Sequence, residues 1–419
     1  MNVLVLVWGY LKARPLNSAL NIFLLALGIA VVSILIVTGH QLHEKISSNS
    51  RGIDLVVGAK GSPMQLILAN VFHADFPTGN ISLAEAERIA RNRLVRTAIP
   101  IALGDSYRGF RIVGTTREYA ELYNGEINAG SWWSRPMEVT LGASVADVLK
   151  LSAGKTFTSS HGLAKTGHAH EGQEFIVVGT LDKTNTVLDD LILTSVESIW
   201  KVHEHETAGD SLNVNGNGHV ASIGTASSLI PSVPAGDSTK EITSLLIRYR
   251  SAMGAVQLPR WVNGQSSLQA ASPAFESARL FSILGVGLGI VNAFAYLLIF
   301  ISALSIFIAL YNSLKERKYD LAIMRSMGAA RSKIFLSVLL EGSVLTFLGT
   351  VVGLALSHSI LFLFGTLVEE AERAGVTGSE FYREEGIILV SSLLLGALCA
   401  MLPAMQAYRT DISKVLASG

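Results

Sequence analysis

The chain has 419 residues, of which 49% are hydrophobic and 16% are charged, and its mean hydropathy is +0.42. Soluble domains carry about 25% charged residues, so this composition argues against a purely soluble protein. The 33 basic and 33 acidic residues balance, which excludes a basic protein that coats nucleic acid. The single cysteine, Cys399, excludes an internal disulfide and a cysteine-based zinc framework.

Four apolar runs predict membrane-spanning helices. The first run, about residues 19–38, has no charged residue and reaches the length of about 20 residues that a spanning helix needs. A cleaved signal peptide would have a shorter apolar core of about 7–15 residues, so we expect a retained helix. The other three runs are about 283–310, 334–364 and 387–405. The third is the longest and is expected to tilt or to project as a stalk.

Basic residues predict the orientation of these helices. Lys and Arg flank the first run, fill the segment between the second and third runs, and follow the fourth, whereas the segment between the third and fourth runs is rich in Glu. Cytoplasmic flanks are typically the basic ones. We therefore expect both termini in the cytoplasm and the long segment after the first helix outside. Glu341 and His358 are the two ionisable residues expected within the spans.

The external segment, residues 42–276, is large enough to form its own core. Short apolar runs bounded by turn residues predict strands, and two patterns predict short helices at 82–94 and 143–151. The segment 203–240 is rich in Gly, Ser, Asn and Pro and is expected to be a flexible insertion. The predicted fold is thus four transmembrane α-helices with an α+β domain inserted between the first and the second. The strand runs are 53–61, 108–116, 174–181, 188–196 and 241–250.

The segment after the second span carries the most specific sequence pattern. Residues 314–334 read LKERKYDLAIMRSMGAARSKI. This pattern resembles the cytoplasmic signature of the FtsX-like permeases, the MacB/LolC/LolE superfamily of ABC transporters, with Asp320 in place of the usual Glu. The ending from Pro403 to Leu416 and several external runs, including 54–57 and 175–179, also resemble this family. The resemblance covers nearly the whole chain.

The resemblance implies that segment 312–333 couples the chain to an ATPase. A short amphipathic helix there would present Ile323, Met324 and Met327 as an adaptable apolar patch, and Gly328 would stop the helix. The alternative is an ordinary basic loop of the kind that any membrane protein has on its cytoplasmic side. The expected coupling residues are Glu316, Arg317, Asp320, Ile323, Met324, Arg325, Met327, Gly328 and Arg331.

What the resemblance implies for function is a non-catalytic permease subunit in a bacterial inner membrane. A separate ABC ATPase would bind ATP, and the permease would pair with a second copy or a related permease and would contact membrane lipid and a periplasmic partner. The expected parts are residues 1–41 with the first span, the MacB-like domain 42–276, and the FtsX-like part 277–419. Two alternatives stay open: a non-transporting regulator like FtsX itself, and a sensor without any ATPase. The substrate is undetermined.

Histidines cluster in the external segment. His161, His168, His170 and Glu171 lie close together in the sequence, and imidazole with carboxylate ligands suits zinc. We hypothesise a weak metal site there; the alternative is a solvated polar loop.

Glycines and one glutamate carry further expectations for the spans. Gly349 and Gly353 form a GxxxG pair, and Gly285, Gly287 and Gly289 are closely spaced in the second span; both groups are expected to allow close helix packing. Glu341, near the cytoplasmic end of its span, could extend to the membrane interface or pair with an arginine, and we expect such pairing there in preference to a role in proton transfer.

Overall fold

The computed structural model describes residues 3–13, 15–160, 169–202, 240–265, 267–368, 371 and 375–409. The chain divides into two compact units: a helical unit of residues 1–43 and 283–419, and a second unit of residues 44–282. Within these described residues, four helices are long and apolar enough to cross a membrane, and an α+β unit is inserted in the sequence between the first and the second of them. The predicted fold class is confirmed.

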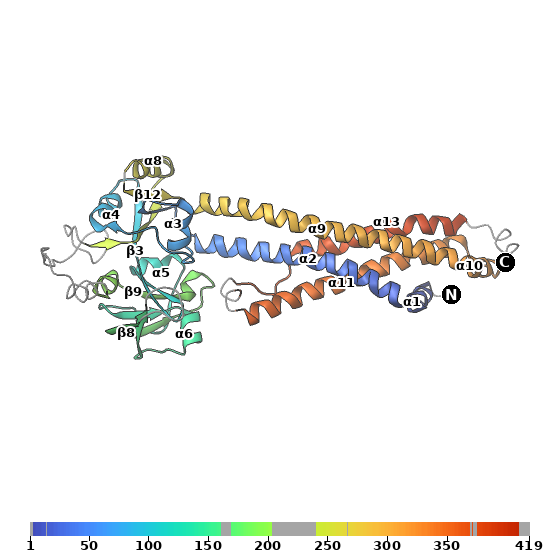
Figure 1. The fold of residues 1–419 in the computed structure, drawn as a ribbon, viewed down its shortest axis with the longest axis horizontal. Helices are drawn as coiled ribbons and strands as arrows, with labels where there is room; N and C mark the ends of the chain where they lie inside the picture. The colour runs from blue at the N-terminus through green and yellow to red at the C-terminus, as the bar shows by residue number, and fades with distance from the viewer. Residues whose placement is uncertain are drawn as a thin grey trace, which may run out of the picture. The chain divides into compact units, whose positions relative to one another are not determined.

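The helical unit is a bundle (Figure 1). Its core joins residues of five helices, including Leu25, Ala295, Leu345 and Ala400. α11 and α13 pack against each other and are bridged by a hydrogen bond from Thr350 Oγ1 to Ser392 Oγ of 2.7 Å. The helices are α1 (Val3–Ala13), α2 (Pro15–Asn49), α9 (Pro273–Glu316), α10 (Lys318–Ser326), α11 (Arg331–Leu367) and α13 (Arg383–Arg409).

Two features of the bundle differ from the prediction. α1 was not predicted; its Val7 and Leu11 are buried in the bundle core. The longest helix is α9, with 44 residues, about 66 Å at 1.5 Å per residue, and not the third span. The apolar run is shorter than α9 because the helix continues through polar residues at both ends.

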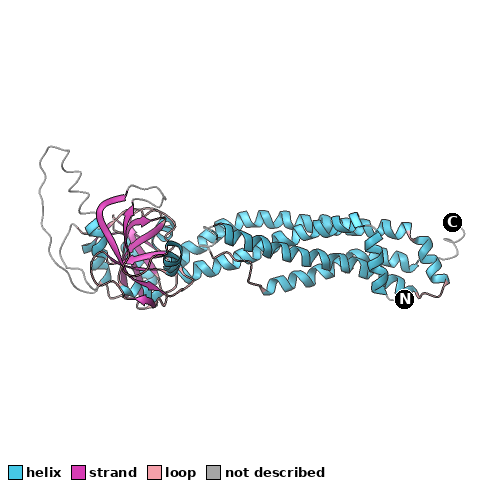
Figure 2. Ribbon diagram, turned by 90° about the horizontal axis from the view of Figure 1, so that it is seen from below, coloured by secondary structure: helices cyan, strands magenta, loops and turns pink. Residues whose placement is uncertain are grey.

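The α+β unit contains a mixed sheet whose strands run in the order β12-β1-β11-β3-β4-β9-β6-β8-β5. β7 pairs with both β3 and β8, so the pairings from β3 through β4, β9, β6, β8 and β7 close on themselves. The magenta strands of Figure 2 show this curled sheet. The strands are β1 (Leu55–Ala59), β2 (Ile81–Ser82), β3 (Val95–Tyr107), β4 (Phe110–Gly114), β5 (Ile127–Gly130), β6 (Glu138–Leu141), β7 (Thr156–Ser160), β8 (Ala169–Leu181), β9 (Leu191–Thr194), β10 (Glu241–Ile242), β11 (Ser244–Tyr249) and β12 (Leu268–Ala271).

Helices cover both faces of this sheet, which explains its continuous apolar runs. Side chains alternate across a strand: Leu55 and Val57 of β1 face one core cluster, and Val56 faces the other. The five predicted strand runs and both predicted helices are confirmed; the central strand β3 was missed because its pattern is irregular. The short helices are α3 (Pro63–Asn70), α4 (Leu83–Ala90), α5 (Arg117–Leu122), α6 (Ala143–Leu149), the 3₁₀ helix η1 (Val187–Asp190) and α8 (Ala252–Asn263).

Candidate functional site

The predicted coupling segment forms a short helix, α10, between two long ones. α10 ends in a complete Schellman motif: Ala329 N donates to Met324 O, and Gly328 N donates to Arg325 O, each at 3.0 Å. Gly328 has φ +96°, a left-handed conformation that glycine adopts without the steric penalty of a side chain. The chain can therefore reverse at Gly328 and begin α11 at Arg331, three residues later.

One face of α10 is packed against the bundle. Leu321 is buried in a cluster with Leu314, Val338 and Ala404, and Met324 packs against that cluster from its edge. Met324 therefore belongs to the inner side, and the predicted patch of Ile323, Met324 and Met327 is corrected in this respect. The reason is packing: Leu321 is buried in the cluster, and Met324, one helical turn later, contacts the same cluster beside it.

The opposite face of α10 is apolar and exposed. Tyr319, Ile323 and Met327 follow each other at intervals of four residues, so they lie on one side of the helix. All three are exposed, Met327 to 82%. We call these three residues the α10 outer face. Tyr319 was not among the predicted coupling residues, although its spacing from Ile323 was readable in the sequence.

Arg317 holds this region together from the turn before α10. Its guanidinium lies 3.3 Å from Glu341 Oε2 on α11 and 3.7 Å from the centre of the Tyr10 ring on α1. The expected pairing of Glu341 with an arginine is thus confirmed. Burial raises the pKa of Tyr10, although the nearby Arg317 opposes that rise. These contacts bring α1, the α9–α10 turn and α11 to one place.

A small cavity adjoins the Arg317–Glu341 pair. Its volume is about 10 Å³, which is room for about one water molecule. Ser313 Oγ lines it and is buried without a hydrogen-bond partner among the residues that the structure describes. A water here would satisfy Ser313 next to the charged pair.

The other predicted coupling residues are spread around this segment. Glu316 is the last residue of α9, Asp320 is exposed in the first turn of α10, and Arg331 is exposed at the first position of α11. Arg325 is half-buried in the last turn of α10. The structure therefore gathers Arg317 with Glu341, and it places Ile323 and Met327 on the outer face.

The hypothetical metal site falls largely outside the described part of the chain. His161 and His168 are not described, and for His170 and Glu171 the structure gives only their place in the backbone of β8. Among the described residues, which omit 161–168 and 203–239, no group of three His, Cys, Asp or Glu side chains could hold a metal ion. The metal hypothesis stays a prediction.

The two glycine groups behave differently. A Cβ on Gly353 would lie 2.7 Å from Ala26 O, and one on Gly349 would lie 2.9 Å from Leu25 Cδ2, so α2 and α11 approach closely at this pair. A Cβ on Gly285, Gly287 or Gly289 would meet no described atom within 4 Å. The close packing expected of these three is therefore not found among the residues that the structure describes.

A second buried pair of ionisable side chains was missed. His358 does not stand alone in its span: Glu385, counted in the sequence with the acidic loop, is the third residue of α13 and lies against His358. The sequence signal for Glu385 is its position three residues after Tyr382, the residue that precedes α13. A glutamate there can accept the backbone N–H of the N-cap residue, which is one half of a capping box.

Comparisons with known proteins match both parts of the chain. The family model described as "FtsX-like permease C-terminal" matches residues 292–412, which include α10. The model described as "MacB-like periplasmic core domain" matches residues 18–244, more than half of the chain. The probable export ATP-binding/permease protein MacB of Pseudomonas entomophila (strain L48) is 31% identical over 105 residues. That stretch is 25% of this chain and 15% of the relative.

Two solved structures resemble the chain weakly. The periplasmic region of MacB from Actinobacillus actinomycetemcomitans has a TM-score of 0.33 and 11% identity, covering 56% of this chain and 97% of that one. The extracellular domain of the noncanonic ABC-type transporter YknZ from Gram-positive bacteria has a TM-score of 0.28 and 12% identity, covering 52% and 99%. Both TM-scores are below 0.5.

Proposed function

This chain belongs to the FtsX-like permeases that carry a MacB-like periplasmic core domain, and from that membership we propose that it is the mechanotransmission subunit of a MacB-type ABC system. A separate ATPase would dock on α10, and the motion would pass through the long helices to the α+β unit. The family identification made from the sequence is confirmed. That membership supports a multi-pass membrane permease, and the proposal assigns the ATP chemistry to an ABC ATPase partner.

The observation that carries the proposal is the α10 outer face. Tyr319, Ile323 and Met327 expose apolar surface on a short, tightly capped helix between two membrane-spanning helices. Exposed contiguous apolar side chains mark interaction sites, and Met and Tyr are enriched at protein interfaces. Arg317 and Glu341 hold the turn before α10 against the bundle, so a push on α10 would reach α11 directly.

The α+β unit is attached in a way that supports transmission. α2 ends at Asn49, whose carbonyl accepts a hydrogen bond from Tyr123 Oη and whose Oδ1 accepts one from Val187 N, both at 2.8 Å. β12 ends two residues before α9 begins, and it pairs with β1, the first strand after α2. A force along α2 or α9 would therefore act on two neighbouring strands of the sheet, β1 and β12.

The orientation is part of the proposal. The basic flanks support cytoplasmic termini in a bacterial inner membrane, with residues 44–282 on the periplasmic side. Export or extraction of an envelope substrate, with a second permease copy or a related permease, would follow from the family. A non-transporting regulator would use the same ATPase contact, so the contact is the first thing to test.

The test compares substitutions on the α10 outer face with a substitution at an exposed polar position near the start of α11. Ile323→Glu and Met327→Glu place a charge on the α10 outer face and should weaken ATPase association at least tenfold, about 1.4 kcal/mol or more, without lowering the thermal stability of the permease. Ser332→Glu, also exposed but polar, is the matched control and should leave association unchanged. The measurement is binding of the purified ATPase subunit to the permease in lipid nanodiscs. Unchanged binding in both variants would refute the docking assignment.

A further inference from the structure

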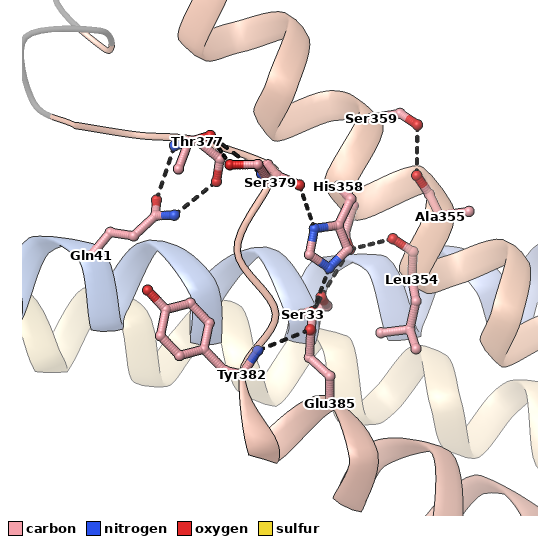
Figure 3. Close-up of polar contacts among 12 residues, drawn as sticks. Ser33, Gln41, Leu354, Ala355, His358, Ser359, Thr377, Ser379, Tyr382 and Glu385 are labelled. Atoms are coloured by element: carbon pink, nitrogen blue, oxygen red, sulfur yellow. Dashed lines mark hydrogen bonds and ion pairs between the residues drawn. The ribbon is translucent and has the colours of Figure 1, made fainter.

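Glu385 uses both carboxylate oxygens at the start of α13 (Figure 3). Oε2 accepts the backbone N–H of Tyr382 at 3.3 Å, which caps the first turn of the helix. Oε1 lies 2.8 Å from Ser33 Oγ on α2 and 2.8 Å from His358 Nε2 on α11. The residue is only 4% exposed, so this carboxylate exchanges its hydration for three protein contacts.

The hydrogen positions on His358 follow from its partners. Nδ1 lies 2.8 Å from the carbonyl oxygen of Gly378, which only accepts hydrogen bonds, so Nδ1 carries a hydrogen. Nε2 faces the carboxylate at 2.8 Å, where two lone pairs would repel each other. A proton must therefore lie between Nε2 and Glu385. The donors Ser33 and Tyr382, together with the start of a helix, favour the ionised carboxylate, which places that proton on the imidazole.

The protonated pair joins three helices and a loop. Ser33 Oγ also lies 2.8 Å from Ser357 Oγ, which links α2 to α11, and the ring of Phe381 lies over His358 with centroids 4.2 Å apart. Gln41 of α2 fixes the same loop: Nε2 donates to Thr377 O at 2.8 Å, and Oε1 accepts from Thr377 N at 3.2 Å. Without the proton, the contact between α11 and α13 at this end loses its central hydrogen bond.

The other titratable groups around the pair lie nearer to solvent. His40 Nε2 of α2 lies 3.4 Å from Glu384 Oε1, with both side chains exposed by about two fifths, and the His40 ring stacks on Tyr382. Tyr382 Oη donates to Glu380, and Arg383 begins α13. α11 contributes no other ionisable residue between Glu341 and its end at Leu367. The described neighbourhood of the pair thus has two histidines, His40 and His358, and three carboxylates, those of Glu380, Glu384 and Glu385.

We propose that Ser33, His358 and Glu385 form a proton-binding site that clasps this end of α13 to α11 and α2. With the proton bound the clasp is closed; as the pH rises the proton leaves, and α13 separates from α11 at this end. An ionisable pair inside a membrane bundle is costly, which makes it a candidate for a functional role. The site lies about 25 Å along α11 from Glu341, and it requires no ATPase for its operation.

The protonation state can be read directly in the full chain. Histidine labelled with ¹⁵N is incorporated into the protein in lipid nanodiscs, and the ring signals of His358 are assigned by their loss in His358→Gln. At pH 6 the wild type should show hydrogens on both ring nitrogens. In Glu385→Gln only Nδ1 should keep its hydrogen, because the amide donates to Nε2 in place of accepting. A bare Nδ1, or two ring hydrogens in both proteins, would overturn the site.

The clasp itself needs a distance measurement. Spin labels at Leu363→Cys on α11 and Ile387→Cys on α13, both exposed positions, are introduced in a Cys399→Ala background. Between pH 6 and pH 9 the wild-type distance should change by about 2 Å or more, the scale of helix shifts in switching proteins. His40→Gln, the matched control, should keep that change, whereas Glu385→Gln, whose amide can donate to Nε2 at either pH, should show the same distance at pH 6 and pH 9. A wild-type distance that is the same at both pH values would refute the clasp, and the wild-type titration needs no folded variant.

Discussion

The buried polar side chains of this chain differ in the kind of partner on which they depend. Arg317 and Glu341 join a turn to a helix, and their side chains are 13% and 9% exposed. His73 in the α+β unit is also buried, but it has no charged partner: its Nε2 contacts Tyr119 Oη at 2.9 Å, and its Nδ1 has no partner among the described residues. Arg317 and Glu341 therefore depend on each other's opposite charge, whereas the buried site of His73 requires an uncharged imidazole.

Removing one member of the Arg317–Glu341 pair should be worse than removing both. Glu341→Ala leaves a largely buried guanidinium without its counter-charge and should destabilise the protein by about 3–5 kcal/mol. The double variant Arg317→Met/Glu341→Leu should recover most of that loss, because two apolar side chains need no pairing. Denaturant unfolding in detergent micelles measures both. Equal losses in the single and double variants would contradict the pairing.

His73 should make the α+β unit sensitive to acid. Burial, with a smaller effect of Arg111, lowers the pKa of His73 to about 3. In the unfolded chain it would take up a proton below about pH 6.5, whereas in the folded chain it stays neutral down to about pH 3. The unfolded state thus binds the extra proton, and stability falls by about 1.4 kcal/mol per pH unit as the pH drops through this window.

The variant His73→Phe isolates this effect. It loses the hydrogen bond to Tyr119, so it should be less stable at pH 7, yet its stability should fall less steeply between pH 6 and pH 4 than that of the wild type. Thermal unfolding of the full chain across this pH range gives the two slopes. Parallel slopes would show that His73 does not titrate on unfolding.

At the scale of elements, small residues decide where helices meet. α2 and α11 touch at Gly349 and Gly353, where a side chain has no room. α2 also approaches α9, because a Cβ on Gly28 would lie 2.9 Å from Ile299 Cγ1. By contrast, the three glycines at 285, 287 and 289 of α9 have open space around them in this chain. The same residue type thus marks a contact in one helix and none in another.

Matched alanine substitutions should separate these two kinds of glycine. Gly353→Ala forces α2 and α11 apart and should cost about 1–3 kcal/mol. Gly287→Ala meets no neighbour and should be neutral or stabilising by up to about 1 kcal/mol, because alanine favours helix over glycine. Unfolding in detergent micelles compares the two. A larger loss for Gly287→Ala would place its face in a contact within the folded chain.

At the scale of the whole molecule, the proposed ATPase contact on α10 and the proposed periplasmic role of the α+β unit both depend on the predicted membrane topology. Four spanning helices would put both ends of the helical unit on one side of the bilayer, and the basic flanks predict that this side is the cytoplasm. α10 and the last turns of α13 pack together through Leu321, Ala404 and Ala407, so the coupling segment and the C-terminal helix share one end of the bundle (Figure 1).

Cysteine labelling from each side tests this topology. In a Cys399→Ala background, Val148→Cys, exposed on α6, should react with a membrane-impermeant maleimide added outside. Ser332→Cys, exposed at the start of α11, should react only after the membrane is opened. Both positions are exposed in the structure, so a difference in labelling reports the side of the membrane. Reaction of both from the outside would break the four-span arrangement.

The sequence by itself determined the parts whose signal is local. Apolar runs of sufficient length located all four spans, because lipid demands a continuous apolar helix whatever surrounds it. Apolar runs of β-branched residues between turn residues located five strands, and the cytoplasmic signature identified the family. Gly328 was predicted as a helix stop because a left-handed turn residue needs no tertiary partner.

The tertiary structure decided whatever depends on a partner far away in the sequence. α1 has too little length to stand as a span, and it is held by the bundle core. Glu385 reads as one more acidic loop residue until the fold sets it beside His358 and Ser33, respectively 27 and 352 positions away. Met324 and Met327 have the same chemistry, and only the packing of α10 turns one inward and the other outward. Composition and periodicity describe a residue's neighbours along the chain, whereas burial and charge pairing depend on its neighbours in space.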